Sequence, residues 1–563
     1  MAVSVLILGG GVGGMSAAHE LVERGFAVTV LEQREVPGGK ARSVEVPGSA
    51  QPPMLPLPGE HGFRFFPGFY RHVIDTMARI PAAGGGSVAD HLAAASLEML
   101  ARMGKPPIEL PPHQPHTLGE LRRVLRTLFG ADTGLSDDDI GFFALKVWQL
   151  MTACPERALH EFENQSWLAF MDAANRSPAF KEYFVDGLTR CLVAARADKA
   201  NVRAGGVVLT QLFYGMFDHT TPLDRLLDGP TSPVWISPWR TYLESRGVHF
   251  EFGRTVAAIE CDGRRVTGVV TSAATSAATS AATSAAGSGV QQWQADHYVC
   301  ALPVETTAPL ITPALLQADP ALAGIGRIAG DVYDMVGIQF YLPDTDVPLV
   351  HGHLSLIDSR WALTGISQRQ FWPGVDFAKL GDGHVGGVLS IDISDWDTPG
   401  LCFPGPDGRN LTARQCRPEQ VALDAWTQLR SSLVPASGPN PLPAALPRWF
   451  IDPGVRFDPT LVANDSRLFV NLVGSWQYRP EAATAVPNLV LASDYVRTHT
   501  NLATMEAANE AARRAVNALI ARSGVAATPC AIWPLHTPEV LKPFIEADCL
   551  LWKAGLPWRG AVA

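Results

Sequence analysis

The chain has 563 residues, 47% of them hydrophobic and 18% charged, which excludes a disordered or fibrous protein. A chain of this length exceeds a single hydrophobic core, so we expect two or three lobes. Its net charge of −10 at pH 7 excludes the broad basic surface that nucleic-acid binding requires.

Other whole-chain features predict a cytoplasmic protein. The cysteines are scattered without a CxxC or metal-ligand spacing, which predicts reduced thiols and no metal site. No apolar stretch is long enough for a transmembrane helix. The N-terminus shows no basic region and no cleavage site, so we expect no signal peptide.

The first thirty residues predict a strand, a glycine-rich turn, a helix and a second strand. An apolar run at 3–8 leads into Gly9-Gly10-Gly11-Val12-Gly13-Gly14, which fits GxGxxG. A helical pattern over 15–24 ends at Gly25, and 27–31 form the next strand, which is followed by Glu32. This order is typical of a dinucleotide-binding unit.

Each residue type in this unit has a task in holding a dinucleotide. Gly9 permits the tight turn, Gly11 lets the backbone approach a pyrophosphate, and Gly14 allows close packing of helix on strand. The helix N-terminus offers unpaired N–H groups to the anion, and Glu32 accepts hydrogen bonds from ribose hydroxyls. The predicted cofactor-binding residues here are Gly9, Gly11, Val12, Gly13, Gly14 and Glu32. They do not by themselves separate FAD from NAD.

The segment after Glu32 favours FAD. Residues 38–43 read GGKARS, which resembles a pattern that flavoproteins of the amine-oxidase and phytoene-desaturase superfamily use beside the pyrophosphate and flavin. The resemblance implies that Gly39 lies at the cofactor. Lys40 and Arg42 offer cationic donors to phosphate.

A C-terminal segment carries the same resemblance. Residues 488–496 (NLVLASDYV) and 497–507 (RTHTNLATMEA) are similar to the superfamily's LFLAGDY and ASMEGA motifs, with Ser493 where the family usually has glycine. The resemblance implies that Asp494 reaches the ribityl chain of FAD. It also implies that Thr504 and Met505 begin a helix whose N-terminus stabilises negative charge on the reduced flavin.

The middle of the chain predicts a third part of the same fold. Residues 247–260 form a strand, a turn and a strand, and 265–270 and 297–302 form two more strands. The family resemblance implies that Val256 meets the adenine through its backbone. The fourfold TSAA repeat within 271–289 predicts a dispensable hairpin loop.

Residues 57–75 (LPGEHGFRFFPGFYRHVID) resemble the segment that passes over the flavin in plant- and cyanobacterial-type phytoene desaturases. Relatives of this branch include hydroxysqualene dehydroxylases. The resemblance puts Gly62 and Phe63 against the isoalloxazine. We take His61 as a proton shuttle near neutral pH and Arg64 as a donor to a flavin or substrate oxygen. The alternative is that the aromatic residues of this segment are core packing.

The rest of the chain predicts a substrate lobe. Residues 85–235 are mainly helical in pattern, with helices at 117–129, 137–152 and 166–174, and 315–450 alternate as a mixed sheet, as at 332–341 and 387–393. Phe66, Trp476 and Tyr478 are the predicted substrate-binding residues. The last two form either an aromatic cage for an amine or part of a tunnel wall.

The extension 526–563 holds a helical pattern over 537–551, with Pro543 in its first turn or breaking it. It predicts a helix docked on the protein, or alternatively a contact with a membrane surface.

Together these features predict an α/β fold. A Rossmann-type FAD domain, built from 1–80, 240–310 and 455–525, carries an α+β substrate lobe from 85–235 and 315–450. The resemblance implies non-covalent FAD and an oxidoreductase, namely a desaturase or dehydrogenase that passes hydride from a lipophilic isoprenoid, carotenoid-like or fatty-acid substrate to flavin N5. O₂ or a quinone would then accept the electrons. The alternatives are an amine oxidase, and a redox-neutral isomerase or non-catalytic flavoprotein.

Overall fold

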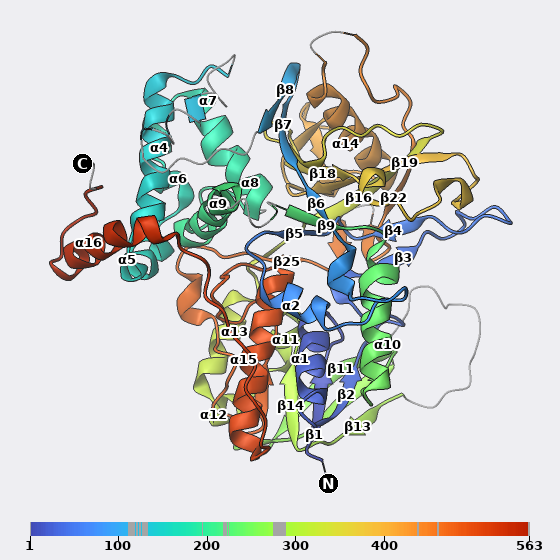
Figure 1. The fold of residues 1–563 in the computed structure, drawn as a ribbon, viewed down its shortest axis with the longest axis vertical. Coiled ribbons are helices and arrows are strands. Elements are labelled where there is room, and N and C mark those ends of the chain that lie inside the picture. The colour runs from blue at the N-terminus through green and yellow to red at the C-terminus, as the bar shows by residue number, and fades with distance from the viewer. Residues whose placement is uncertain are drawn as a thin grey trace.

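The computed structural model describes residues 2–560 except 111–118, 120, 121, 123, 124, 127–132, 194, 218–221, 223, 274–288, 436, 437, 459 and 460. Figure 1 shows a lower lobe that contains the N-terminus, below two upper parts. One upper part is a group of helices and the other is built around a sheet. The predicted helix at 117–129 and the TSAA repeat lie largely outside the described residues.

The lower lobe is built on a parallel sheet in the order β10-β2-β1-β14-β26. Its strands come from three distant parts of the chain: β1 (Ser4–Leu8), β2 (Ala27–Leu31), β10 (His249–Glu251), β14 (His297–Cys300) and β26 (Leu489–Leu491). The central strands are mostly apolar and buried, as expected for a parallel sheet that is covered on both faces. The predicted Rossmann unit and its discontinuous assembly are confirmed.

Two helices from opposite ends of the chain pack side by side in this lobe. Helix α1 (Val12–Val22) begins directly in the glycine turn and contacts α15 (Met505–Ser523), as Figure 1 shows. The predicted Gly25 stop is confirmed, since Gly25 has a positive φ of 82°. A small antiparallel sheet of β11 (Arg254–Cys261), β12 (Val266–Ala273) and β13 (Gln291–Trp293) covers the lobe further.

The sheet part of the upper region has seven strands in the order β22-β16-β19-β18-β17-β7-β8. The strands are β7 (Leu97–Arg102), β8 (Lys105–Leu110), β16 (Val336–Pro343), β17 (Gly352–Leu356), β18 (Leu363–Ser367), β19 (Val385–Ile393) and β22 (Arg448–Ile451). Helix α14 (Pro418–Ser432) packs on one face, with the Trp426 and Phe340 ring centroids 4.9 Å apart. The predicted strand at 387–393 is confirmed as β19. The strand predicted at 332–341 is divided in the structure into β15 (Val332–Tyr333), which pairs with β25 (Leu468–Phe469), and β16.

Residues 85–235 are not helical throughout. Their first part enters the seven-stranded sheet as β7 and β8, and also forms β6 (Leu92–Ala95). Strand β6 joins β5 (Phe65–Pro67) and β9 (Asp224–Leu227) in a three-stranded sheet with the order β5-β9-β6. These strands escape local pattern reading because their partners lie far away in the sequence, as in the parallel pairing of β7 with β17.

The helical part contains α4 (Asp137–Thr152), α5 (Pro155–His160), α6 (Trp167–Phe170), α8 (Leu188–Val193) and α9 (Val202–Phe217). Helix α4 has the predicted bounds, and the Ser136 hydroxyl caps it by accepting from the Asp139 N–H at 3.1 Å. The predicted helix at 166–174 is shorter, since α6 ends at Phe170.

The C-terminal extension docks on the helical part through α16 (Lys542–Lys553). Pro543 lies in its first turn, as predicted. The buried Asp548 carboxylate pairs with the Arg157 guanidinium at 2.9 Å, and Leu541 and Phe544 pack among the apolar side chains of the helical part. Among the described helices none is long and apolar enough to cross a membrane.

Candidate active site

The glycine turn brings three segments into close contact. Gly9 has a φ of 98°, a conformation that favours glycine. A Cβ atom on Gly14 would lie 1.9 Å from the Gly9 carbonyl oxygen, which confirms the predicted close packing. A Cβ on Gly13 would lie 2.2 Å from the carbonyl oxygen of Ala492, so Gly13 admits the end of β26 beside α1.

Gly11 leaves the start of α1 open. It is the N-cap residue, and no side chain accepts a hydrogen bond from the first turn of this helix. A Cβ on Gly11 would meet only the Cα atom of Gly39, at 3.9 Å. The first turn of α1 therefore offers N–H groups to an anion.

Glu32 is buried at the end of β2, beside the glycine turn. One carboxylate oxygen accepts from the Gly10 N–H at 2.8 Å and the other from the Arg34 N–H at 2.9 Å. The Arg254 N–H donates to the Glu32 carbonyl at 2.9 Å, which brings the start of β11 to this position. Val256 follows Arg254 along β11 and therefore also lies close to Glu32. This position is consistent with the adenine side of a dinucleotide site.

Arg42 has a different role from the predicted one. Its guanidinium is buried, donates to both carboxylate oxygens of Asp452 at 3.0 and 3.2 Å, and donates to the Gly39 carbonyl at 2.8 Å. A buried cation takes a buried carboxylate partner because an unpaired charge there is very unfavourable. Arg42 thus braces the glycine segment. Lys40 donates its ammonium to the Arg467 carbonyl.

His61 is buried next to the same carboxylate. Its Nδ1 atom lies 3.8 Å from an Asp452 oxygen, and neither ring nitrogen has a hydrogen-bond partner among the described residues. Burial lowers the pKa of His61 to about 4, assisted by the cations Arg64, Arg42 and Lys40 and opposed by Asp452. Desolvation thus favours the neutral imidazole, and the predicted proton transfer by His61 near neutral pH stays a prediction.

Arg64 folds back on its own segment. Its guanidinium donates to the carbonyls of Gly62 and Phe63 at 2.9 Å and to that of Lys40, while Nε has no partner among the described residues. The side chain thus ties the segment over the flavin to the glycine segment. Its predicted contact with a flavin or substrate oxygen stays a prediction.

The C-terminal flavin segment is held by one buried arginine. The Arg479 guanidinium donates to the carbonyls of Asp494, Tyr495 and Val496, which fixes the backbone at Asp494. The Thr504 hydroxyl caps α15 by accepting from the Ala507 N–H at 3.1 Å, so the helix begins at Met505 as predicted.

Sequence reasoning missed one further acid beside Asp494. Burial raises the pKa of Glu305, the Asp494 charge adds to this rise, and Lys40 opposes it. Glu305 follows β14 on the next element, α11 (Val304–Thr307). Its position at the carboxyl end of a parallel strand is the sequence signal that could have found it.

A cavity of about 180 Å³ adjoins these segments. On one side it is lined by Phe63, Ala503 and Thr504, the residues nearest the predicted flavin position. Opposite walls come from the inner face of the seven-stranded sheet and from α9, where Gly205 and Val208 line it. The predicted aromatic segment therefore borders this cavity.

Only part of the predicted substrate set lines this cavity. Phe65 lines it, but Phe66 is fully buried in the core of the lower lobe, its ring centroid 5.6 Å from that of Trp235. Successive side chains of a strand point to opposite faces, so in β5 Phe65 and not Phe66 faces the cavity. The prediction for Phe66 is wrong.

Trp476 and Tyr478 also lie outside the cavity lining. The Arg203 guanidinium stacks on the Trp476 ring at 3.9 Å, and Arg479 and Arg497 approach the same ring within 5.3 Å. Tyr478 is 42% exposed. Neither forms an aromatic cage here, because the cations of the protein already occupy the Trp476 faces.

Carboxyl groups that sequence reasoning did not identify also line the cavity. They belong to Glu98, Asp224 and Asp392. Burial raises the pKa of Asp392 to about 7, with Arg64 opposing the rise. The His353 imidazole lies among them, and burial lowers its pKa to about 4. No lysine or arginine is found along the described walls of this cavity.

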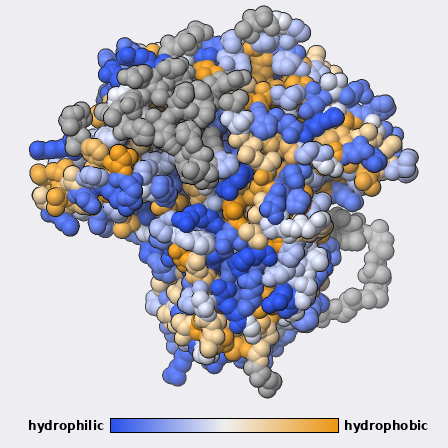
Figure 2. All heavy atoms as spheres, viewed as in Figure 1, coloured by the Kyte–Doolittle hydropathy of each residue, from blue (hydrophilic) through white to orange (hydrophobic). Residues whose placement is uncertain are grey.

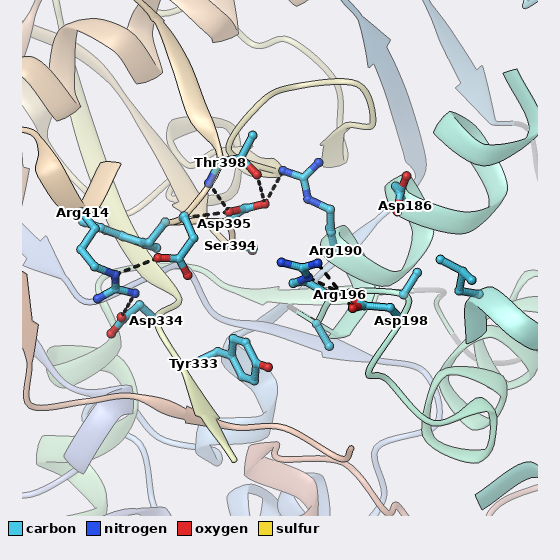
Figure 3. Close-up of a pocket in the computed structure, with 15 residues that line it drawn as sticks. Asp186, Arg190, Arg196, Asp198, Tyr333, Asp334, Ser394, Asp395, Thr398 and Arg414 are labelled. Carbon is cyan, nitrogen blue, oxygen red and sulfur yellow. Dashed lines mark hydrogen bonds and ion pairs between the residues drawn. The ribbon is translucent and has the colours of Figure 1, made fainter. Parts of the chain in front are cut away.

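A larger hollow of about 550 Å³ lies elsewhere (Figure 3). It contains none of the predicted site residues. Its charges pair with one another, as in the 2.8 Å contact of Arg190 with Asp395 and the 2.7 Å contact of Arg414 with Asp334. Arg196 also pairs with Asp198, whereas Figure 3 draws no ion pair for Asp186.

Comparison with known proteins agrees with this geometry. The sequence profile of the flavin-containing amine oxidoreductases matches residues 12–520. The chain belongs to the flavin-containing amine oxidoreductase family. Hydroxyneurosporene desaturase of Rhodobacter capsulatus is 37% identical over 101 residues, which is 17% of each chain. All-trans-zeta-carotene desaturase of Myxococcus xanthus is 41% identical over 61 residues, 10% of this chain and 12% of the relative. Each match thus spans less than a fifth of the relative's length.

Solved structures of the family share the fold. Cyclohexylamine oxidase from Brevibacterium oxydans IH-35A has a TM-score of 0.58 and 12% identity, covering 93% of this chain and 100% of that one. Putrescine oxidase bound to putrescine has a TM-score of 0.55 and 11% identity, with the same coverage. At this identity the likeness concerns the fold.

The residues present fit the FAD of this family. Gly11 and Gly39 form a cradle without side chains at the open N-terminus of α1. Glu32 stands at the end of β2, where ribose hydroxyls bind in this fold. The unpartnered ring nitrogens of His61 are buried polar atoms that need a partner. These features support FAD as the cofactor, and its non-covalent attachment stays a prediction.

Proposed function

We propose that this protein is an FAD-dependent dehydrogenase or desaturase that oxidises a lipophilic substrate in the cavity beside the flavin segments. The observation that carries the proposal is the cavity itself. Its walls between Phe63 and Thr504 combine aromatic rings with small aliphatic side chains of α9. Such a surface binds an apolar body and keeps water from the reacting carbon.

Bound FAD supplies the hydride acceptor. The residues of the chain orient and polarise it. The N-terminus of α15, capped by Thr504, favours negative charge near its first turn. Arg64 holds the segment that carries Phe63 in place through the carbonyls on either side. The partial likeness to two carotenoid desaturases supports a lipophilic substrate.

The acidic lining of the cavity favours a second candidate, the oxidation of an amine. Asp224 and Asp392 each have a buried carboxylate oxygen without a hydrogen-bond partner among the described residues. A substrate ammonium group would supply a charge of the opposite sign. This candidate uses the carboxylates to bind the ammonium group, whereas the first binds its substrate through the apolar walls.

Anaerobic mixing of the holoprotein with a substrate panel tests both candidates. The panel contains zeta-carotene, a long-chain fatty acid, putrescine and cyclohexylamine, and the measurement is bleaching of the oxidised flavin absorbance. We expect the lipophilic compounds to bleach the flavin and putrescine to leave it oxidised. Bleaching by amines alone would replace the first candidate with the second.

We further propose that O₂ or a quinone reoxidises the flavin.

We also propose that the C-terminal extension contacts a membrane surface. Leu550 on α16 is 68% exposed, and Val540 and Leu556 are also exposed. Figure 2 shows apolar surface at the left of the view, where α16 lies in Figure 1. Co-sedimentation with anionic lipid vesicles tests the contact. The expected result is vesicle binding that Leu550→Asp weakens, and equal recovery of both proteins in the supernatant would contradict it.

A further inference from the structure

The carboxyl groups of the buried Asp224 and the half-buried Glu98 meet where two sheets join at the cavity. Asp224 begins β9, and its backbone is in register with Pro67 of β5 and Ala95 of β6. Glu98 lies in β7, just after β6, and is in register with His353 of β17. The chain passes from the small sheet to the large one between Ala95 and Leu97. This crossing brings the carboxyl groups of Glu98 and Asp224 into contact.

The two carboxyl groups titrate as a pair. Burial and the neighbouring negative charge of Asp224 raise the pKa of Glu98, and burial also raises the pKa of Asp224, where hydrogen bonding to Glu98 opposes the rise. Two close carboxylates cannot both ionise readily, so the pair holds one proton between them. The pair then carries one negative charge and can accept one more proton.

The surroundings leave this charge without a partner inside the cavity. The Asp224 Oδ1 atom is buried and no described residue donates to it. Arg225 is the nearest cation, but its guanidinium donates to the carbonyls of Phe66, Pro67 and Tyr70. His353 is neutral because of burial, and its Nε2 atom is also unpartnered among the described residues. A free acceptor therefore faces the space where a substrate would lie.

We propose that the Glu98–Asp224 pair accepts the proton that leaves the substrate during oxidation. The inference rests on the proposed function. Removing two hydrogens breaks one C–H bond whose electron pair leaves with hydrogen as hydride to the flavin. It also breaks an adjacent C–H, N–H or O–H bond whose proton goes to the pair. The substrate gains a double bond, the pair becomes neutral, and the two electrons later pass to O₂ or a quinone.

A lipophilic substrate loses its proton from carbon and an amine loses it from nitrogen, but in both cases the proton needs a nearby base. A positioned base contributes about 10²–10⁴-fold to the rate of such a step. Asp392, which also lines the cavity, is the competing carboxyl group. Its carboxyl lies beside Gly62, where an added Cβ would be 2.8 Å from Oδ1, and beside the Arg64 charge. That location ties Asp392 to the flavin segment.

The first test measures the shared proton directly, without turnover. Infrared titration of the holoprotein should show the carbonyl stretch of a protonated carboxylic acid that disappears between about pH 6 and 8. Glu98→Gln and Asp224→Asn should each remove or shift this band. Asp228→Asn is the matched control. Asp228 lies just after the other end of β9, pairs with His91 at 2.9 Å and does not line the cavity. A parent protein without a titrating band would overturn the proposal.

The second test measures flavin reduction by whichever panel compound bleaches the parent. The parent rate should rise with pH as the neutral pair loses the first of its two protons, near pH 6. Each single variant should move the midpoint of this pH profile, because the remaining carboxyl titrates alone. The double variant Glu98→Gln/Asp224→Asn should lower the rate by about 10²–10⁴-fold and lose the pH dependence. The Asp228→Asn control should keep the profile.

Two observations separate the possible failures. Reduction by dithionite reports the flavin site alone and should be equal in all variants. If the double variant keeps the parent rate and profile, the proton goes elsewhere and the proposal is wrong. Failure of the proposed function shows differently, as a parent flavin that no compound bleaches while the infrared band still titrates.

Discussion

The buried ion pair of Arg42 and Asp452 offers the sharpest test of how the cofactor cradle is held. The Asp452 side chain is 1% exposed and that of Arg42 is 7% exposed. Asp452→Ala removes both carboxylate acceptors and leaves the buried guanidinium with only the Gly39 carbonyl. Leaving one partner of a buried pair uncompensated typically costs about 3–5 kcal/mol in the free energy of unfolding. We expect a loss of this size.

The measurement is the urea midpoint followed by circular dichroism. Asp465→Ala is the matched control, because Asp465 pairs with Arg456 at 2.7 Å on the surface, where about 0–1 kcal/mol is expected. The double variant Arg42→Met/Asp452→Ala should lose less free energy of unfolding than its two single variants lose together, since it buries no unpaired charge. If Asp452→Ala is no more harmful than Asp465→Ala, the pair does not brace the glycine segment.

Three further predictions concern the cofactor and the cavity. Glu32→Ala and Asp494→Ala should each weaken FAD binding by about 1–3 kcal/mol, measured by titration of stripped protein with FAD, and an unchanged affinity would contradict the assignment of that residue. Arg64→Leu should retain FAD but slow flavin reduction by up to about 10²–10³-fold in stopped-flow absorbance, and a parent-like rate would limit Arg64 to packing. Burial raises the pKa of Glu98 from 4.5 in the unfolded chain to about 8 in the folded protein. The folded protein therefore keeps a proton that the unfolded chain loses, so Glu98 lowers the free energy of unfolding increasingly as the pH rises from about 4.5 to 8. Glu98→Gln should therefore raise the melting temperature at pH 8, with a gain of up to about 4 kcal/mol in the free energy of unfolding, and should not raise it at pH 4. An equal change at both pH values would refute this.

Local sequence determines the cofactor half of this protein. Gly9 and Gly14 sit in a strand–turn–helix unit whose contacts are between near neighbours in sequence, so the glycine pattern alone predicts their roles. The same holds for the cap at Ser136 and the start of α15 at Thr504. These features depend on hydrogen bonds within a few residues, which residue type specifies directly.

The partners of charged residues could not be predicted in the same way. Arg42 was expected to bind phosphate because its motif lies at the pyrophosphate, yet Asp452 arrives from another part of the chain and pairs with it. A long cation has several acceptors within reach, and the fold decides which one is buried beside it. His61 likewise reads as a neutral-pH titrating group until its burial is known.

Sequence by itself thus determined the Rossmann core, the FAD-type motifs and the segment that borders the cavity. Only the tertiary structure decided that Phe65 and not Phe66 faces that cavity, because strand pleating and the position of the core set the direction of each side chain. It also decided that Glu98 and Asp224 meet. Neither residue belongs to a motif. Their contact exists because the chain passes from the small sheet to the large sheet between β6 and β7, beside β9.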